Sequence, residues 1–274
     1  MTRGEGLSHW QAEPVRVWQE LWGIPLLEVY ATLTSTNDRA RELARGGALP
    51  FTTVIAEEQS AGRGRGGRSW ASPAGQGLWL STLVGGAGRE PSPLTPILAG
   101  VAVARAVAAV APACSPGIKW PNDVMLDGRK VCGILCEAGG DGSGIAVGIG
   151  INVRQRPADF PPHLRGSAIS LENAHGGSVS RQRLAGALMQ ALRELLAEPR
   201  WRLDAPLAEE VWALDVLRGR MVTVSTGPGG RCLGVAEDGT LRVEDEGGRE
   251  RAVSAGTVGL RAEDATQDTT PLST

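Results

Sequence analysis

Apolar residues recur at helical spacing in several stretches of the chain. The clearest stretch lies between 94 and 111, where they stand three, four and seven positions apart, as in a helix with one buried face. Gly23 is placed to end a first helix, and Ser35 or Thr36 is placed to cap the next one. The predicted helices span 10–22, 37–45, 94–111, 181–198 and 206–217.

Runs of β-branched and apolar residues between turn sequences predict strands. Three such runs in the middle of the chain are joined by Asp127-Gly128 and by an Asp-Gly-Ser-Gly turn at 141–144, so we expect an antiparallel meander. Helices around a mixed or antiparallel sheet, without strict βαβ alternation, favour the α+β class. The predicted strands of this part span 25–33, 52–57, 77–84, 117–126, 130–139 and 144–153.

The sequence changes in character after Leu217. Four short strand-like runs separated by glycine-rich turns predict a small all-β module. We therefore expect a larger domain over 1–217 that carries the chemistry, a β domain over 218–262 and a frayed polar tail over 263–274. The four runs span 220–226, 231–236, 240–245 and 249–254.

Composition and charge exclude several classes of protein. The chain has 274 residues, 21% of them charged, and a formal net charge of −2, which argues against disorder and against a generally basic surface. We therefore expect no binding to nucleic acid or membrane, and with no secretion signal or bilayer-spanning stretch we expect a cytoplasmic protein. The four cysteines lack C-x-x-C spacing and the three histidines are scattered, so no zinc site or disulfide framework is predicted.

The strongest local motif is the loop 59–70, which reads QSAGRGRGGRSW. Its four glycines let the backbone approach a ligand closely, and Arg63, Arg65 and Arg68 can fork around phosphate oxygens. The loop therefore predicts a site for a polyphosphate or a phosphodiester. The alternative is a solvated basic loop or an Arg-Gly segment that binds RNA, although this loop is pinned between two predicted strands. A Walker A sequence is absent, which disfavours a P-loop NTPase.

The two lysines of the chain, Lys119 and Lys130, lie close together in the stretch KWPND…KVCGILCE. Every other basic side chain is arginine, so a compact ammonium here indicates a geometric need that a planar guanidinium does not meet. Chance clustering of two residues is the alternative. Asn122 and Asp123, between the two lysines, can hold a ligand or a hydrated metal ion.

A third motif, GIGINV at 148–153, ends a predicted strand. Alternation places Gly148, Gly150 and Asn152 on one face, which then consists of bare backbone and one amide. A ligand could lie flat on such a face. Close crossing by a neighbouring element would explain the glycines equally well, but it would not explain Asn152.

Taken together and in order, five motifs resemble those of the biotin protein ligases, also called biotin–[acetyl-CoA-carboxylase] ligases or holocarboxylase synthetases. The resemblance covers about 27–262 and implies a mixed sheet flanked by helices, like that of class II tRNA synthetases, with a small C-terminal SH3-like barrel. It also implies that biotin is activated by ATP and Mg²⁺ to biotinyl-5′-AMP and passed to a lysine of a biotin carboxyl carrier protein of acetyl-CoA carboxylase. The motifs are TSTN at 34–37, GRGRGGR at 62–68, KWPND at 119–123, KVCGILCE at 130–137 and GIGINV at 148–153.

The resemblance also implies roles for matching residues. Lys130 is the first candidate for the catalytic residue, accompanied by Arg63, Arg65 and Asp123. The stretch 154–177 lies where the family has a loop that covers the adenylate and keeps water from it. The residues expected to contact biotin are Ser35, Thr36, Asn37, Gln59, Arg63, Gly64, Arg65, Lys130 and Gly133. Those expected to contact ATP are Arg65, Arg68, Trp70, Lys119, Asn122, Lys130 and Asn152, with no certain metal ligand.

Two departures from the family pattern affect these expectations. Gly66 stands where relatives often carry a basic or bulky residue, so the loop has one charge fewer. Only a short segment precedes the strand predicted at 25–33, so we expect a monofunctional enzyme without a DNA-binding domain and leave a homodimer open. The nearest alternative function is that of a lipoate–protein ligase or octanoyltransferase of the same superfamily. A more distant one is an RNA-binding protein that uses the Arg-Gly loop.

Overall fold

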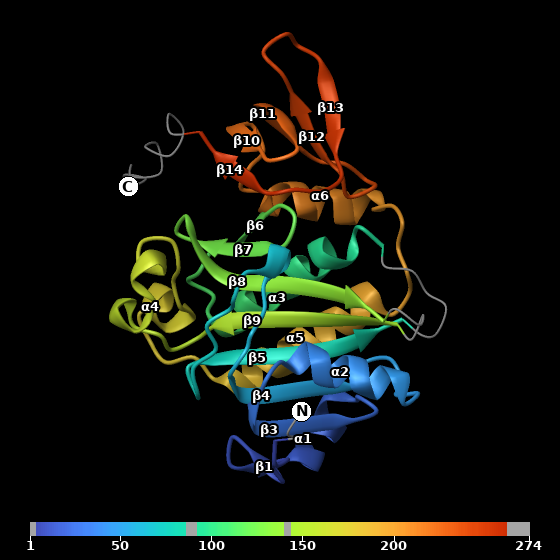
Figure 1. Cartoon of the computed structure of the whole chain (residues 1–274), viewed down its shortest axis with the longest axis vertical. Helices are drawn as coiled ribbons and strands as arrows, with labels where there is room; N and C mark the ends of the chain where they lie inside the picture. Colours follow the sequence, from blue (N-terminus) through green and yellow to red (C-terminus); the bar gives the residue numbers. More distant parts are fainter. Residues whose placement is uncertain (1–3, 86–91, 140–143, 262–274) are drawn as a thin grey trace.

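A seven-stranded mixed sheet forms the centre of the computed structural model, which describes residues 4–85, 92–139 and 144–261 (Figure 1). The two strands at one edge of this sheet, β3 and β4, pair in parallel, and all other neighbouring strands pair antiparallel. This arrangement confirms the α+β class with a mixed sheet. In spatial order the strands are β3 (Leu27–Leu33), β4 (Thr53–Gln59), β5 (Gly77–Val84), β9 (Ile145–Asn152), β8 (Arg129–Ala138), β7 (Asp123–Leu126) and β6 (Gly117–Lys119).

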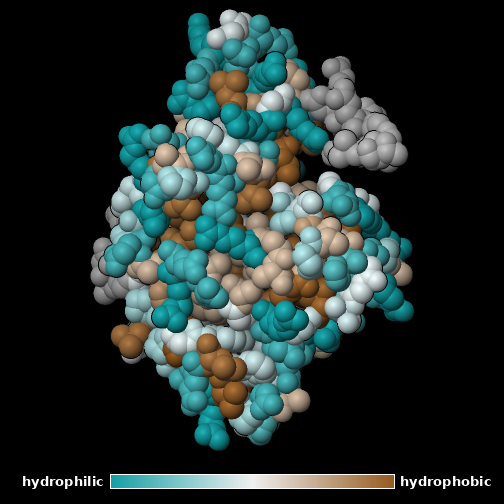
Figure 2. Space-filling view, turned by 180° about the vertical axis from the view of Figure 1, so that it is seen from behind, coloured by the Kyte–Doolittle hydropathy of each residue, from teal (hydrophilic) through white to brown (hydrophobic). Residues whose placement is uncertain are grey.

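Helices cover both faces of this sheet. On one face α3 (Thr95–Val110) and α5 (Arg181–Leu196) pack against each other and against the strands in a large apolar core. On the other face α2 (Thr36–Arg45) packs over β4, β5 and β9 and closes a smaller core. Seen from behind, the surface is largely hydrophilic with separate apolar patches (Figure 2), because the apolar faces of the helices point inward. Among the described residues, no helix is long and apolar enough to cross a membrane.

Most predicted elements of the large domain are present, but two predictions are wrong in part. The first helix, α1 (Val15–Trp22), ends at Gly23 as expected but begins late, because β1 (His9–Trp10) and β2 (Glu13–Pro14) pair as a hairpin before it. Helix α6 (Ala205–Leu214) begins one residue before the helix predicted over 206–217 and ends before it. The single strand predicted over 117–126 is instead the antiparallel pair β6 and β7.

The break in that predicted strand falls at Pro121. Proline has no N–H to donate to a ladder, and here the chain turns and pairs Lys119 with Asp123 across β6 and β7. The turn Asp127-Gly128 has the positive φ angles expected for a tight hairpin. The predicted turn at 141–144 lies largely outside the described residues. The meander therefore has four strands, and its first turn is flanked by Lys119 and Asp123.

The C-terminal part forms a five-stranded antiparallel sheet, with one strand more than the sequence predicted. In the described part of the chain no pairing joins its two outer strands, so the order is open and a closed barrel is not observed. It contacts the large sheet, since the Trp120 indole donates a hydrogen bond to the Gly239 carbonyl at 3.0 Å. The domain boundary at 217 stays a prediction, and the tail over 263–274 lies outside the described residues. The strands, in spatial order, are β13 (Glu250–Val253), β12 (Leu241–Glu244), β11 (Gly227–Val235), β10 (Met221–Val224) and β14 (Val258–Leu260).

Candidate active site

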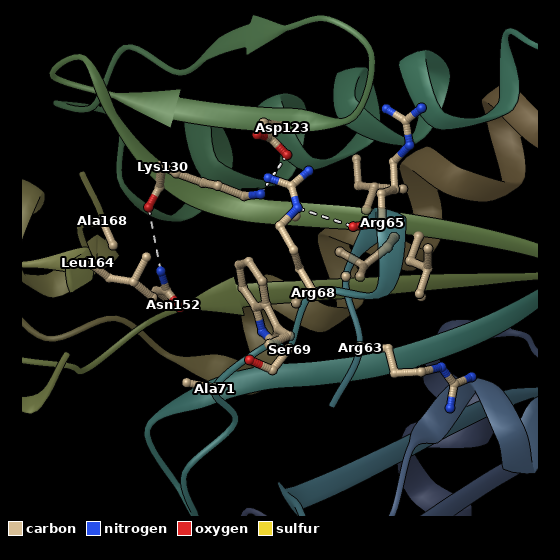
Figure 3. Close-up of a pocket in the computed structure, with 18 of the residues that line it drawn as sticks. Arg63, Arg65, Arg68, Ser69, Ala71, Asp123, Lys130, Asn152, Leu164 and Ala168 are labelled. Carbon is tan, nitrogen blue, oxygen red and sulfur yellow. Dashed lines mark hydrogen bonds and ion pairs between the residues drawn. The ribbon is translucent and has the colours of Figure 1, made fainter. Parts of the chain in front are cut away.

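A pocket of about 410 Å³ opens on the α2 side of the central sheet (Figure 3). Its size lies within the usual range for small-molecule sites. The loop 59–70 crosses in front of β8 and β9 (Figure 1, cyan) and forms one wall, and the segment 155–168 forms another. The catalytic candidate Asp123 lines this pocket, and so do all the residues expected to contact biotin or ATP: Ser35, Thr36, Asn37, Gln59, Arg63, Gly64, Arg65, Arg68, Trp70, Lys119, Asn122, Lys130, Gly133 and Asn152.

A buried chain of hydrogen bonds forms the polar floor of the pocket at the start of α2. Ser35 is the N-cap residue, and the side-chain oxygen Oε1 of Gln59 accepts from the Thr36 backbone N–H at 2.9 Å and from the Thr36 hydroxyl at 3.1 Å. The Ser81 hydroxyl lies 2.7 Å from Thr36 Oγ1 and 2.6 Å from Asn37 Oδ1. The sequence analysis did not identify Ser81. The only indication of a role was a polar residue inside the largely apolar strand β5. We refer to Thr36, Asn37, Gln59 and Ser81 as the polar floor.

Two carboxylates that sequence reasoning also missed hold the first arginine of the loop. Arg63 donates to both oxygens of Asp38, at 2.7 and 2.8 Å, and to Glu137 Oε2 at 2.9 Å. The hydrogen bond with Asp38, assisted by Glu137, raises the pKa of Arg63. In Figure 3 the Arg63 guanidinium points away from Lys130. Its charge is thus compensated within the protein before any ligand binds.

Lys130 and Asp123 form an ion pair at the centre of the pocket, with Nζ and Oδ1 2.6 Å apart. Lys130 and Gly133 are three positions apart, so strict alternation would place them on opposite faces of β8. A bulge prevents this: Val124 pairs with Cys132 and Met125 with Lys130, which leaves one extra residue in β8. A Cβ on Gly133 would lie 3.2 Å from Lys130 Nζ, which confirms that both residues face the pocket.

The glycines of β9 make room for protein side chains. A Cβ on Gly150 would lie 2.5 Å from the Trp70 indole nitrogen, and one on Gly148 would overlap Asn37 Oδ1. Close crossing by protein side chains, the alternative to a ligand on this face, therefore explains the two glycines. Both still line the pocket, so contact of a ligand with this strand stays a prediction. The Asn152 amide donates to the Ile169 carbonyl at 3.1 Å, so it also fastens the neighbouring segment.

The open side of the pocket carries cations without carboxylate partners. Arg65 donates to Asn122 Oδ1 at 3.1 Å, and the exposed Arg68 donates from Nε to the Arg65 carbonyl at 3.1 Å. Figure 3 shows Arg68 extending toward Asp123 and Lys130. Within the described ranges, no carboxylate pairs with Arg65, Arg68 or Lys119. These three cations are therefore available to an anionic ligand, in contrast to Arg63.

The segment predicted as a covering loop is fastened to the backbone of Lys130. It contains two short 3₁₀ turns and α4 (Leu171–His175). The Lys130 N–H donates to the Ser167 carbonyl at 2.8 Å, and the Lys130 carbonyl accepts from Ile169 at 3.0 Å. Phe160 and Leu164 from this segment line the pocket. The sequence analysis did not name them, and the only indication was that both are apolar within a proline-rich stretch. The segment lies beside the Lys130–Asp123 ion pair, where it is positioned to limit access of water to this part of the pocket.

The cysteines next to the pocket are not suited to nucleophilic catalysis. Burial raises the pKa of Cys136 to about 12 and raises that of Cys132 further. Neither residue belongs to the described pocket lining. At neutral pH both thiols stay protonated, which disfavours a transferase that uses a cysteine nucleophile.

Comparison with known proteins identifies the family. The profile of the biotin/lipoate A/B protein ligase family matches residues 29–154. The chain is 36% identical over 241 residues to the bifunctional ligase/repressor BirA of Bacillus subtilis, across 81% of this chain and 70% of that relative. It is 35% identical over 245 residues to a biotin–[acetyl-CoA-carboxylase] ligase of Mycobacterium tuberculosis, across 85% of this chain and 88% of that relative. The chain belongs to the biotin protein ligases.

The fold agrees with that assignment. The structure resembles the biotin protein ligase of Aquifex aeolicus solved with biotin and ATP, with a TM-score of 0.76 and 27% identity. The match covers 87% of this chain and 99% of that one. The biotin protein ligase family expected from the five sequence motifs is thereby confirmed.

Proposed function

We propose that this chain activates biotin with ATP to form biotinyl-5′-AMP and then transfers biotin to a lysine of a biotin carboxyl carrier protein. The observation that carries the proposal is one pocket in which a buried polar floor meets a cluster of cations, with Lys130 between them. Its M. tuberculosis relative is named for acetyl-CoA carboxylase, so the carrier we propose is the one of that enzyme. We further infer that the C-terminal sheet is the SH3-like module of the family.

The floor is suited to the neutral ureido group of biotin. A buried urea needs donors and acceptors at fixed positions, because a polar group left unpaired in a buried site costs about 1–3 kcal/mol. Ser35, Thr36, Asn37 and Gln59 supply hydroxyl and amide groups there. Apolar lining residues such as Leu80 then face the ring and the alkyl chain. The carboxylate of biotin would lie toward Lys130.

In the first step a carboxylate oxygen of biotin attacks the α-phosphorus of ATP. The new bond joins the acyl oxygen to phosphorus, and the bond from the α-phosphorus to the bridging oxygen breaks, so pyrophosphate leaves. Two anions must approach each other, and charge then builds on the phosphoryl oxygens. We assign Lys130 to the carboxylate and the reacting phosphate, and Lys119, Arg65 and Arg68 to the phosphates. Asp123 orients the Lys130 ammonium.

Mg²⁺ is expected to enter with the phosphates of ATP, since it usually keeps several waters and takes one or two protein carboxylates. Asp123, a carboxylate in the cationic part of the pocket, is of the right chemistry to ligate it directly or through water. Bound Mg²⁺ would neutralise part of the phosphate charge.

In the second step the amine of the carrier lysine attacks the acyl carbon, an amide forms and AMP leaves. The attacking amine must lose a proton, and we assign Asp123 to orient the amine or accept that proton, because its carboxylate lies 2.6 Å from Lys130 Nζ. The segment 155–168 shields the mixed anhydride from water until the carrier arrives.

The test combines the full chain with biotin, ATP, Mg²⁺ and an apo carrier domain. We expect biotin-dependent release of pyrophosphate and a carrier mass increased by one biotin, with no increase when the acceptor lysine is replaced by arginine. A parallel reaction with lipoate separates the nearest alternative. Preference for lipoate, or no pyrophosphate release with biotin, would contradict the proposal.

A further inference from the structure

Glu137 lies at the junction of the polar floor and the arginine loop but is not part of the pocket lining. Its Oε2 accepts a hydrogen bond from the Asn37 side-chain amide at 2.7 Å and one from Arg63 at 2.9 Å. One carboxylate oxygen therefore contacts both a residue assigned to biotin and the first arginine of the loop. The proposed function gives Glu137 no role, and the following inference rests on that function.

The contact with Asn37 fixes which way its amide points. A carboxylate and the Leu135 carbonyl only accept hydrogen bonds, and both face Asn37 Nδ2, at 2.7 and 3.2 Å. On the opposite side, the Ser81 hydroxyl lies 2.6 Å from Asn37 Oδ1. A flipped amide would place its oxygen against two acceptors, which is unfavourable. Both Nδ2 hydrogens are used by these two acceptors, so Asn37 can offer a ligand only a lone pair of Oδ1, in an orientation that Glu137 helps to set.

The contact with Arg63 anchors the start of the loop. Asp38 on α2 and Glu137 on β8 form ion pairs with the same Arg63 guanidinium, so one side chain connects the loop to both the helix and the sheet. Arg63 also forms an isolated β-bridge with Ser69, so the two ends of the cationic turn lie side by side. A shift of Arg63 would therefore move the base of the turn that carries Arg65 and Arg68.

We propose that Glu137 is a positioning residue that orients the Asn37 amide for biotin and at the same time holds Arg63 at the base of the loop. The affinity for biotin then depends on a carboxylate that does not touch the ligand. A glutamine at this position keeps one acceptor oxygen for Asn37 and Arg63 but loses the negative charge that pairs with Arg63. Its NH2 group would then face Arg63 Nη2, which lies 3.3 Å from Glu137 Oε1.

The experiment measures pyrophosphate release by the Glu137→Gln variant, with the KM for biotin and the KM for ATP determined separately. We expect a rise of about tenfold in the KM for biotin, equivalent to ~1.4 kcal/mol, and changes below about threefold in kcat and in the KM for ATP. The Glu42→Gln variant is the matched control, because it removes another Glu–Arg pair on α2 and should leave both KM values unchanged. Thermal unfolding of each variant is followed in parallel.

A second variant keeps the test decisive if Glu137→Gln does not fold. Glu137→Asp retains the charge on a shorter side chain and should raise the KM for biotin by a few fold. A KM for biotin that is normal in the folded variants, or an equal loss in both KM values that follows the unfolding temperature, would overturn the proposal. If the unmodified chain itself releases no pyrophosphate with biotin, the proposed function fails instead, so the two failures are distinguishable.

Discussion

The two ends of the pocket are built differently. At the biotin end Thr36, Asn37 and Ser81 of the polar floor are buried, with Asn37 only 3% exposed, and Gln59 is half-buried. Their hydrogen bonds are made within the protein. At the loop end Gly66, Gly67 and Arg68 are exposed, and among the described residues no carboxylate pairs with Arg65 or Arg68. The biotin end therefore has its hydrogen bonds in place before a ligand binds, whereas the cations at the loop end gain an anionic partner only when ATP binds.

The chemistry of the two ligand parts explains this difference. A neutral urea is desolvated on binding, so its partners must already be in place, because an unpaired buried polar group is costly. Phosphates bring several charges and can draw exposed arginines toward them. The predictions below test whether this division holds, beginning with the residue where the two ends meet.

Replacing Lys130 with alanine should cause the largest loss. Lys130 is the cation nearest the proposed reacting centre, and removing one such donor typically lowers kcat by about 10²–10³. Because the side chain is only half-buried, we expect the free energy of unfolding to change by less than about 1 kcal/mol. Pyrophosphate release in single turnovers measures the first effect and denaturant unfolding the second. The neighbouring variant Arg129→Ala should behave like the parent, and normal turnover in Lys130→Ala would remove Lys130 from its role.

The Arg68→Ala variant should separate the two ends. Loss of an exposed cation that faces the phosphates should raise the KM for ATP about ten- to thirtyfold and leave the KM for biotin unchanged. Stability should stay within about 0.5 kcal/mol, because Arg68 is exposed. Steady-state kinetics with each substrate varied in turn give both values, with the exposed Arg183→Ala as control. A KM for biotin that rises equally would show that the two ends are not independent.

The Ser81→Ala variant should affect the opposite end. It removes the buried hydroxyl that contacts Thr36 Oγ1 and Asn37 Oδ1, while the bonds of Thr36 to Gln59 and of Asn37 to Glu137 remain. We expect a destabilisation of about 1–3 kcal/mol and a rise of about three- to tenfold in the KM for biotin. The KM for ATP should not change. Thr82→Val is the matched control, since it removes a buried hydroxyl bonded to Thr53 on the other face of β5. If that control raised the KM for biotin as much, the effect of Ser81 would be general loss of stability.

The smallest effect concerns a buried acid outside the pocket. Asp215 lies between α6 and the C-terminal sheet, and burial raises its pKa above the usual 3.8. Between the unfolded and folded pKa values the folded chain binds the proton more tightly, so the free energy of unfolding falls as the pH rises through that window. Asp215→Asn should remove this slope and be slightly more stable than the parent at pH 7 to 8, with no gain below pH 3.8. Unfolding measured across pH checks this, and a gain that persists in acid would contradict it. Both KM values should be unchanged.

Much of this arrangement could be predicted from the sequence. The buried strands and α3 follow from apolar runs and spacing, which depend on burial alone. The glycine- and arginine-rich loop and the two lysines could be assigned to a ligand because their residue types are unusual for their positions. The three arginines of the loop and both lysines line a single pocket.

What could not be predicted depends on pairing between distant segments. The bulge that turns Lys130 toward Gly133 arises from the register of β7 against β8. The contact of Asn37 with Glu137 joins positions 100 residues apart in the chain, and nothing in either local sequence indicates it. The bare face of β9 was predicted from alternation, yet local spacing could not show that Trp70 fills it at Gly150.

Hydrogen exchange of backbone amides tests the difference between the two ends most directly. The full chain is compared alone, with biotin, and with biotin plus a non-hydrolysable ATP analogue. We predict that amides of β4 and β5 beneath the polar floor are protected in all three samples, and that amides over 64–70 gain protection only when both ligands are bound. A loop already protected without ligand, or a floor that becomes protected only on adding biotin, would contradict the account.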